Sequence, residues 1–312
     1  MKKKMIARIA LLAAVVLLGQ LKTLAQFDPM FTQYMFNELM INPAYAGSRE
    51  SLSATGLLRE QWVGLDGAPS TQTISLHAPM AQQKVGLGIS FVNESIGVSK
   101  RTGFNINGAY RIKMEKSTLA FGLQLGMVGI TENLANLNLQ TDNQFMVSTG
   151  RKTAPNFGFG VYYNTAKWYV GLSIPRMMQN RLDVSAGTAK VQNRLNPENF
   201  HYFITAGAVY TLSPAVKLRP NLMLKEVSGA PLQVDISANV LFNDFIWAGL
   251  AYRTGDAASL LLGTYLTKQF RLGYSYDYSL SALQDFNTGS HEIMLGYDFN
   301  YDKDKVVTPR YF

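Results

Sequence analysis

The sequence predicts an all-β fold: a transmembrane outer-membrane β-barrel of about 14 antiparallel strands with a short N-terminal helical or plug segment. Three observations predict it. No stretch beyond the first 25 residues is apolar for 18 residues, so no later helix is expected to cross a bilayer. Fourteen later segments alternate between apolar and polar residues with the period of a strand. The connections after even-numbered segments are mostly short, and the longest connections follow odd-numbered segments. Bacterial outer-membrane barrels likewise have short turns at one end and longer loops at the other.

The first residues have the pattern of a secretory signal peptide. Four basic residues within the first eight precede the apolar stretch Ile9 to Gly19, and small residues stand before Gln26. About 11 apolar residues are too few for the roughly 20 of a membrane anchor helix. We therefore predict that residues 1–25 are a signal peptide. The sequence contains no cysteine, which excludes a lipoprotein anchor, disulfides and thiolate metal sites.

The basic net charge does not indicate nucleic acid binding. The formal charge is +8, but residues 1–25 carry five of the 29 Lys and Arg and no Asp or Glu. The remainder has 24 basic and 21 acidic residues, a net charge of +3. Recognition of a polyanion needs a clustered excess of cations, so no nucleic acid is expected as a partner.

Residues 26–50 do not alternate. Met30, Phe31, Tyr34, Met35 and Leu39 fit a short amphipathic helix that ends near Asn42 and Pro43. We interpret this stretch as a periplasmic or lumenal element, because a barrel of this size encloses more space than its inward side chains fill. A flexible leader is the alternative.

Residues 51–300 carry the alternating segments and are assigned to the barrel, and 301–312 to a polar C-terminal tail. In 270–279 the even positions are mostly aromatic, whereas the odd positions include Arg271, Ser275 and Asp277. The predicted strands cover approximately 51–60, 70–78, 84–92, 101–113, 117–130, 155–164, 167–174, 200–212, 215–226, 231–242, 245–253, 257–267, 268–279 and 290–300.

The connections separate a barrel from a soluble β-sandwich, which also alternates. The connections after even-numbered strands are short, such as 114–116 and 213–214, and the two longest, 131–154 and 175–199, both follow odd-numbered strands. Short periplasmic turns and longer external loops are typical of outer-membrane barrels. We therefore predict that 131–154 and 175–199 are external.

The charged face of each strand is predicted to point into the lumen. A Lys or Arg at the lipid midplane costs about 2 to 4 kcal/mol, so the apolar faces should meet lipid. Aromatic residues near strand ends, Trp168, Trp247, Tyr276 and Phe299, suit the interfacial girdles. The predicted lumen-lining residues are Arg59, Asn105, Asn107, Arg111, Arg219, Asp235, Arg271, Asp277 and Glu292.

No set of residues indicates catalysis, and we predict a protein that is not an enzyme and uses no cofactor. The three histidines, His77, His201 and His291, have no metal-ligand spacing, and sequence neighbours on a strand face opposite sides. Glycine pairs such as Gly86 and Gly88 lie inside strands without a following helix. They indicate bends or clearance in the lumen, since a phosphate cradle needs a helix N-terminus.

The predicted docking site for a partner is the external mouth, formed by the long loops 131–154 and 175–199 and by the first hairpin loop. Gln61, Trp62, Leu65 and Asp66 place a tryptophan beside polar groups, a combination that concentrates binding energy. Packing of Trp62 at the membrane interface or in the barrel mouth is the alternative.

Several long segments resemble the PorP/SprF family of type IX secretion and gliding-motility proteins of Bacteroidetes. They include QFDPMFTQYMFNELMINPAYAGS at 26–48, REQWVGLDGAPSTQTISLHAP at 59–79, RLGYSYDYSL at 271–280 and GSHEIMLGYDF at 289–299. The resemblance covers almost all of the chain after residue 25. It implies an outer-membrane barrel that supports secretion or surface retention of cargo proteins with a C-terminal sorting domain, gliding adhesins among them.

The resemblance also implies partners. These are the secreted cargo, other type IX secretion components and outer-membrane lipid. A periplasmic peptidoglycan-binding protein is one candidate among the secretion components. The competing function is a passive outer-membrane channel for hydrophobic or small polar solutes, which a barrel with an N-terminal plug also fits. The resemblance assigns no function to individual residues.

Overall fold

The computed structural model describes residues 30–49, 51–133, 149–185, 188–228 and 230–299. The predicted signal peptide and polar tail lie outside these residues. Within them, no helix has the length and apolar character needed to cross a membrane.

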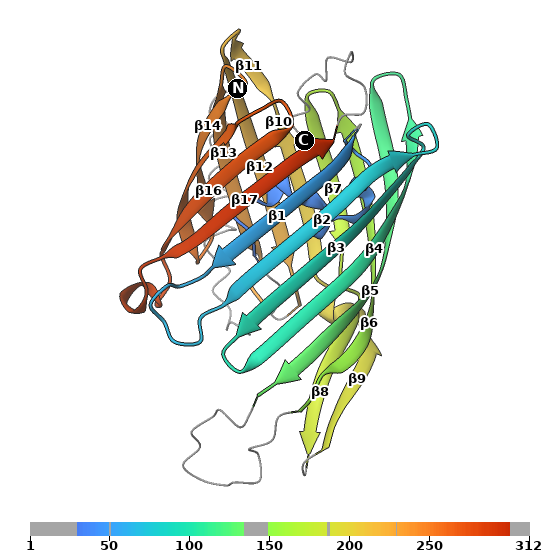
Figure 1. The fold of residues 1–312 in the computed structure, drawn as a ribbon, viewed down its shortest axis with the longest axis vertical. Helices are drawn as coiled ribbons and strands as arrows, with labels where there is room; N and C mark the ends of the chain where they lie inside the picture. The colour runs from blue at the N-terminus through green and yellow to red at the C-terminus, as the bar shows by residue number, and fades with distance from the viewer. Residues whose placement is uncertain (1–29, 50, 134–148, 186–187, 229, 300–312) are drawn as a thin grey trace, which may run out of the picture.

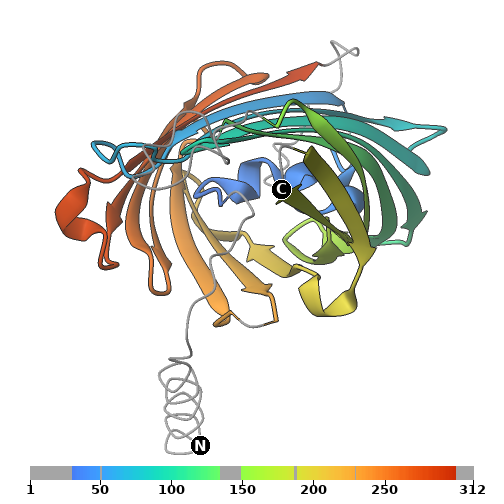
Figure 2. The same cartoon turned by 90° about the horizontal axis from the view of Figure 1, so that it is seen from below.

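The described chain is a closed antiparallel barrel (Figures 1 and 2). Sequential neighbours pair, β1 pairs with β17, and β10 pairs with both β7 and β12, which closes the ring. Because β10 and β11 are one strand interrupted at Val209, the barrel has 14 strands, as the alternation predicts. The strands are β1 Leu52–Glu60, β2 Ser70–Met80, β3 Val85–Ile96, β4 Ser99–Lys113, β5 Ser117–Glu132, β6 Lys152–Thr165, β7 Trp168–Ile174, β10 Tyr202–Ala208, β11 Tyr210–Ser213, β12 Val216–Glu226, β13 Gln233–Phe242, β14 Ile246–Arg253, β15 Ala257–Tyr265, β16 Phe270–Ser279 and β17 Ser290–Phe299.

Alternation along each strand separates an interior face from an outer face. On β16, Arg271, Ser275 and Asp277 are buried, whereas Tyr274 and Tyr278 are exposed. The outer face of the whole barrel is apolar, with residues such as Leu123 and Leu250 exposed by 64% and 67%. An apolar exterior around a polar interior is the arrangement that a lipid environment requires.

The two ends of the barrel differ. The connections at one end, the top of Figure 1, are all short: 81–84, 114–116, 166–167, 214–215, 243–245 and 266–269. The opposite end carries the longer connections, including 61–69, 133–151, 175–201 and 280–289. One difference from the predicted pattern is the connection after β3, which the sequence analysis placed at 93–100. The structure extends both strands, so that only Gly97 and Val98 separate β3 from β4.

The long connection 175–201 contains a hairpin that the alternation did not predict. Its strands, β8 Met178–Ser185 and β9 Thr188–Leu195, pair only with each other. A short 3-10 turn, η6 Pro197–Asn199, leads from the hairpin back to β10. In Figure 1 the hairpin projects from the lower end of the barrel, beside β6.

The N-terminal segment, residues 30–49, lies inside the barrel (Figure 2). It forms three 3-10 turns, η1 Tyr34–Phe36, η2 Glu38–Met40 and η3 Pro43–Tyr45, where one amphipathic helix was predicted. That prediction of a single helix is wrong. Asn37 and Asn42 break the helical path, and Asn42 accepts a hydrogen bond from the backbone N–H of Ala44 at 2.9 Å, a cap that starts the last turn.

Trp247 is also placed differently from its prediction. Its indole is fully buried inside the barrel and packs against Phe36 with ring centroids 5.2 Å apart. It therefore belongs to the interior, not to an interfacial girdle. Trp168 and Phe299, by contrast, are exposed on the outer face by 43% and 41%.

Candidate partner-binding mouth and barrel interior

Inward glycines seat the N-terminal segment against the barrel wall. A Cβ on Gly122 of β5 would lie 2.1 Å from the backbone nitrogen of Ala44, and one on Gly86 of β3 would lie 1.9 Å from the carbonyl oxygen of Ala46. On β6, a Cβ on Gly160 would lie 2.0 Å from the side-chain oxygen of Asn42. Each distance is shorter than any real contact, so the wall accepts the segment only because these positions lack a side chain.

A charged cluster holds the start of the segment. The carboxylate of Glu292 on β17 accepts hydrogen bonds from the backbone N–H groups of Thr32 at 3.0 Å and Gln33 at 2.8 Å. Arg59 of β1 forms ion pairs with the same carboxylate at 3.1 Å and with Asp277 of β16 at 2.7 Å. The hydroxyl of Thr32 also donates to Asp277. Charge-assisted bonds of this kind are stronger than neutral ones.

Arg253, which the sequence analysis did not select, extends this cluster. It pairs with Asp235 of β13 at 2.9 Å and with Asp256 at 3.0 Å, and it donates to the hydroxyl of Thr32 at 3.3 Å. Arg253 occupies one of the alternating positions of β14 that face the interior. It is the last residue of the strand, however, and alternation predicts the direction of a side chain less well at a strand end.

A second charged cluster fixes the end of the segment. Arg49 and Arg271 both donate to Asp298, at 2.8 and 2.9 Å, and the hydroxyl of Ser53 donates to the other oxygen of that carboxylate. Arg271 also donates to the hydroxyl of Thr55 at 3.0 Å. Asp298 therefore joins the N-terminal segment to β1, β16 and β17.

Neutral hydrogen bonds hold the middle of the segment. Asn37 accepts from the hydroxyl of Ser75 at 2.7 Å, and Asn42 donates to the carbonyl of Val161 at 3.0 Å. The carbonyl of Ile41 accepts from Ser173 at 2.8 Å, and the backbone N–H of Gly47 donates to His77 at 3.1 Å. The segment is thus bonded to the wall along its described length.

The structure places the nine residues that the sequence analysis assigned to the lumen on the inner face. Asn105 is half-buried and donates to Ser90 at 3.3 Å, and the others are buried. Arg219 stacks over the rings of Phe36 and Trp247, at 5.4 and 5.7 Å from their centroids. The eight buried residues are Arg59, Asn107, Arg111, Arg219, Asp235, Arg271, Asp277 and Glu292.

The loop 61–69, which holds the four candidate partner-binding residues, is braced against the loop 280–289. The backbone N–H of Trp62 donates to the hydroxyl of Ser290 at 3.1 Å, and the chain turns at Trp62 with a left-handed φ of 46°. Val63 exchanges backbone bonds with Thr288 and Gly289, each 2.8 Å long. Gln61, Trp62 and Leu65 are half-buried, and Asp66 is exposed. These two loops form one ridge on the rim.

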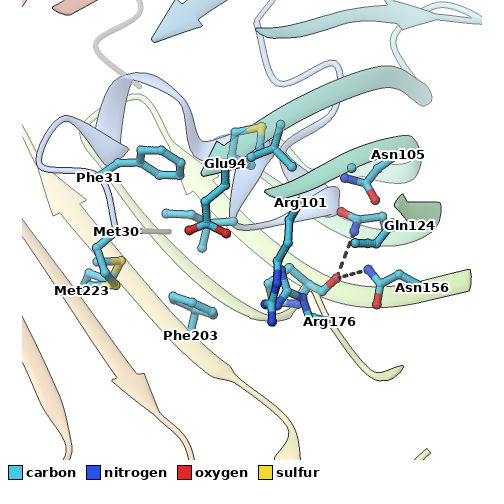
Figure 3. A pocket seen from close by; sticks show the side chains of 16 residues that line it. Met30, Phe31, Glu94, Arg101, Asn105, Gln124, Asn156, Arg176, Phe203 and Met223 are labelled. Carbon is cyan, nitrogen blue, oxygen red and sulfur yellow. Dashed lines mark hydrogen bonds between the residues drawn. The ribbon is translucent and has the colours of Figure 1, made fainter. Parts of the chain in front are cut away.

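The ridge and the β8–β9 hairpin stand on opposite sides of the mouth (Figures 1 and 2). The structure therefore does not bring the loop 61–69 together with the hairpin. Part of the other long connection, 134–148, lies outside the described residues. Between the ridge and the hairpin, the N-terminal segment lies across the interior, and a cavity lined by Met30, Phe31 and Met40 lies beside it (Figure 3). The described residues contain no group of three acidic or histidine side chains able to hold a metal.

Comparison with known proteins gives a family and a distant fold likeness. A family model described as "Type IX secretion system membrane protein PorP/SprF" matches residues 23–297. No curated protein matches the sequence. Among solved structures, the CymD monoaromatic hydrocarbon channel is 13% identical, with a TM-score of 0.49, over 87% of this chain and 94% of that one. The toluene transporter TbuX of Ralstonia pickettii is 10% identical, with a TM-score of 0.48, over 84% and 93%. These distant likenesses do not bear on what this chain binds.

Proposed function

Because the chain belongs to the PorP/SprF family of type IX secretion system membrane proteins, we propose that it is a non-enzymatic outer-membrane barrel that retains a secreted protein at its external mouth. The secreted protein carries a C-terminal sorting domain, and gliding adhesins are candidates. Export by the signal peptide 1–25 delivers the chain to the periplasm. The end with the short turns then faces the periplasm, and the end with the ridge and the hairpin faces outward.

The occupied interior is the observation that carries this proposal. Residues 30–49 are bonded to the wall by two charged clusters, and they lie on glycines that leave no room for a side chain. Displacing the segment would remove two backbone N–H donors from the buried carboxylate of Glu292 and the guanidinium of Arg49 from the half-buried carboxylate of Asp298, which is costly. A barrel wall that fits residues 30–49 this closely suits a rigid scaffold that binds its partner at the mouth.

The mouth offers two places for a partner. One is the ridge, where we assign Gln61, Trp62, Leu65 and Asp66 to partner contact. The other is the β8–β9 hairpin, which extends beyond the barrel wall. Recognition is usually placed on loops held by a rigid scaffold, and both features meet that description. The short turns at the opposite end are available to other secretion components, with a periplasmic peptidoglycan-binding protein as one candidate, and the apolar outer face meets outer-membrane lipid.

A passive channel for hydrophobic or small polar solutes is the alternative function. It requires a continuous path past the N-terminal segment, and the close approach of Ala44 and Ala46 to the wall argues against one on that side. The retention hypothesis needs no such path. It is therefore the better supported of the two.

Removal of the hairpin tests the proposal. Met178–Leu195 can be replaced by a short Gly-Ser linker without touching Pro175, whose carbonyl accepts hydrogen bonds from Gln124 and Asn156 at 2.9 Å each. We expect a correctly inserted, heat-modifiable barrel that no longer retains the secreted protein on the surface of intact cells. Immunolabelling of the secreted protein on cells and in the medium measures retention.

A shorter replacement in the ridge, 281–287 by the same linker, separates the two sides of the mouth. If retention survives the hairpin deletion combined with Trp62→Ala, docking at this end is wrong. The N-terminal segment and the opposite end would then be the better candidates.

A further inference from the structure

The cavity beside the N-terminal segment has one apolar side. Three residues of the segment and one each of β10 and β12 form it: Met30, Phe31, Met40, Phe203 and Met223. The cavity has an empty volume of about 870 Å³, counting its open mouth. Methionine side chains are flexible and polarizable, so this side adapts to apolar groups of different shape.

The other side of the cavity carries charge (Figure 3). Arg101 of β4 and Arg176, which follows β7, line it together with Glu94 of β3. Both arginines are half-buried and line the open cavity, so a ligand inside it can reach them. Glu94 is buried and lies directly opposite Arg101 in the pairing of β3 with β4. Two guanidinium groups and one carboxylate leave the lining with one positive charge in excess.

The amides on this side already have partners. Gln124 and Asn156 both donate hydrogen bonds to the carbonyl of Pro175 at 2.9 Å, and Asn105 donates to Ser90 at 3.3 Å. A guanidinium group differs from them because its five N–H donors let it keep an existing partner and still bind a ligand. Its planar fork matches a carboxylate with two parallel hydrogen bonds. The arginines are therefore the groups that a ligand contacts on this side.

We infer that this cavity binds an organic acid made of one carboxylate and a compact apolar group. The carboxylate contacts the guanidinium groups of Arg101 and Arg176, and the apolar group lies on the methionine and phenylalanine side. The single negative charge of the acid balances the excess positive charge of the lining. Free fatty acids and the carboxyl end of a polypeptide whose last residue is apolar share this chemistry. The inference does not depend on the proposed function, because it needs no retained protein.

An acid of this kind matches both sides better than other ligands do. A neutral hydrocarbon covers the apolar side but brings no acceptor for Arg101 and Arg176. An inorganic anion or a free sugar leaves the apolar side uncovered. A phosphate monoester brings about 1.5 to 2 negative charges, more than the excess of the lining, into a site that already holds the carboxylate of Glu94.

Methionine-methyl NMR of the full chain in phosphatidylcholine nanodiscs tests the inference. The probe is hexanoate, which is ionised at neutral pH and short enough to stay in water. A ligand of this size is expected to bind with a Kd of about 1 mM. We expect dose-dependent shifts of the Met40 and Met223 methyl signals. Acetate lacks the apolar group and hexanamide lacks the charge, so each should bind at least about tenfold more weakly.

One variant and a matched control separate a direct contact from an effect of overall charge. Arg176→Gln removes a guanidinium group from the cavity and should weaken hexanoate binding about tenfold, as expected for a hydrogen bond between charged groups. Arg151→Gln removes an exposed cation outside the cavity, at the end of the barrel with the longer connections, and should change the Kd by less than about twofold. The comparison of hexanoate with hexanamide uses the wild-type chain and decides the matter if Arg176→Gln fails to fold.

Three results would overturn the inference: no shift with hexanoate, equal affinity for hexanoate and for hexanamide or hexylammonium, or equal losses in Arg176→Gln and Arg151→Gln. N-acetyl-leucine, which carries the carboxyl end of a peptide, distinguishes the two sources of the acid. Tighter binding than that of hexanoate would assign the cavity to a polypeptide end, and weaker binding would assign it to fatty acids. None of these results bears on the proposed function, because the experiment contains no secreted protein.

Discussion

The carboxylate of Glu292 accepts a hydrogen bond of 2.8 Å from the backbone N–H of Gln33, which lies 259 residues earlier in the chain. The last strand of the barrel thus holds the first described residues of the chain. Arg59 lies beside the same carboxylate and neutralises it. This contact makes the N-terminal segment part of the folded wall.

The first prediction concerns this contact. Glu292→Ala removes the acceptor for two backbone N–H groups and one partner of Arg59, so we expect it to lower the free energy of unfolding by about 3 to 5 kcal/mol. Ser275→Ala removes a buried hydroxyl that no described residue bonds and should change it by less than about 0.5 kcal/mol. Urea unfolding in lipid vesicles measures both. Equal effects would mean that Glu292 does not anchor the segment.

The second prediction concerns the glycine seat. Gly122→Val puts side-chain atoms where the backbone of Ala44 lies, and overpacking of this kind costs about 1 to 3 kcal/mol or more. Gly108 on β4 has no heavy atom within 4 Å of its ideal Cβ, so Gly108→Val is the matched control. We expect Gly122→Val to expose residues 42–46 to protease in the inserted barrel. Protection as in the wild type would contradict the seating.

The third prediction compares two tryptophans that look alike in the sequence. Trp247→Ala empties a fully buried site beside Phe36 and should cost about 3 to 5 kcal/mol. Trp168→Ala removes a half-exposed ring from the outer face and should cost less than half as much. The same unfolding measurement checks it, and a larger loss at Trp168 would restore the girdle assignment for Trp247.

The fourth prediction tests the lipid-facing surface. Leu125 in the middle of β5 is 59% exposed on the outer face, so Leu125→Arg should cost about 2 to 4 kcal/mol if it lies near the midplane. Leu125→Phe keeps an apolar side chain there and should fold normally. If vesicle insertion tolerates both substitutions equally, this face does not meet lipid.

Period-2 alternation was enough to predict most of the barrel. It predicted the number of strands and, in the first and last strands, their bounds to within one or two residues, because lipid outside and water or polar groups inside select opposite residue types on the two faces. It did not predict the β8–β9 hairpin. Both strands of that hairpin, MQNRLDVS and TAKVQNRL, pair only with each other and are not part of the barrel sheet, so the alternation that marks the barrel strands is not expected in them.

The placement of Trp247 was predicted from its residue type and not from its position in the alternating pattern, and that prediction is wrong. Trp247 was assigned to a girdle because tryptophan is common there, although it shares the inward parity of Ala251 and Arg253. The ion pair between Arg59 and Asp277 could not be predicted either. Parity gives the face of each residue, but the pairing of residues 218 positions apart follows from closure of the barrel and from the path of the N-terminal segment.

The conductance of the purified wild-type chain in planar bilayers decides whether the barrel is a fixed scaffold or a passive channel. Because residues 30–49 are bonded to the wall by two charged clusters, we expect no steady current with salt or with small polar solutes, whereas a variant lacking residues 30–49 that still inserts should conduct. A steady, solute-dependent conductance of the wild type would contradict the account and favour the passive channel.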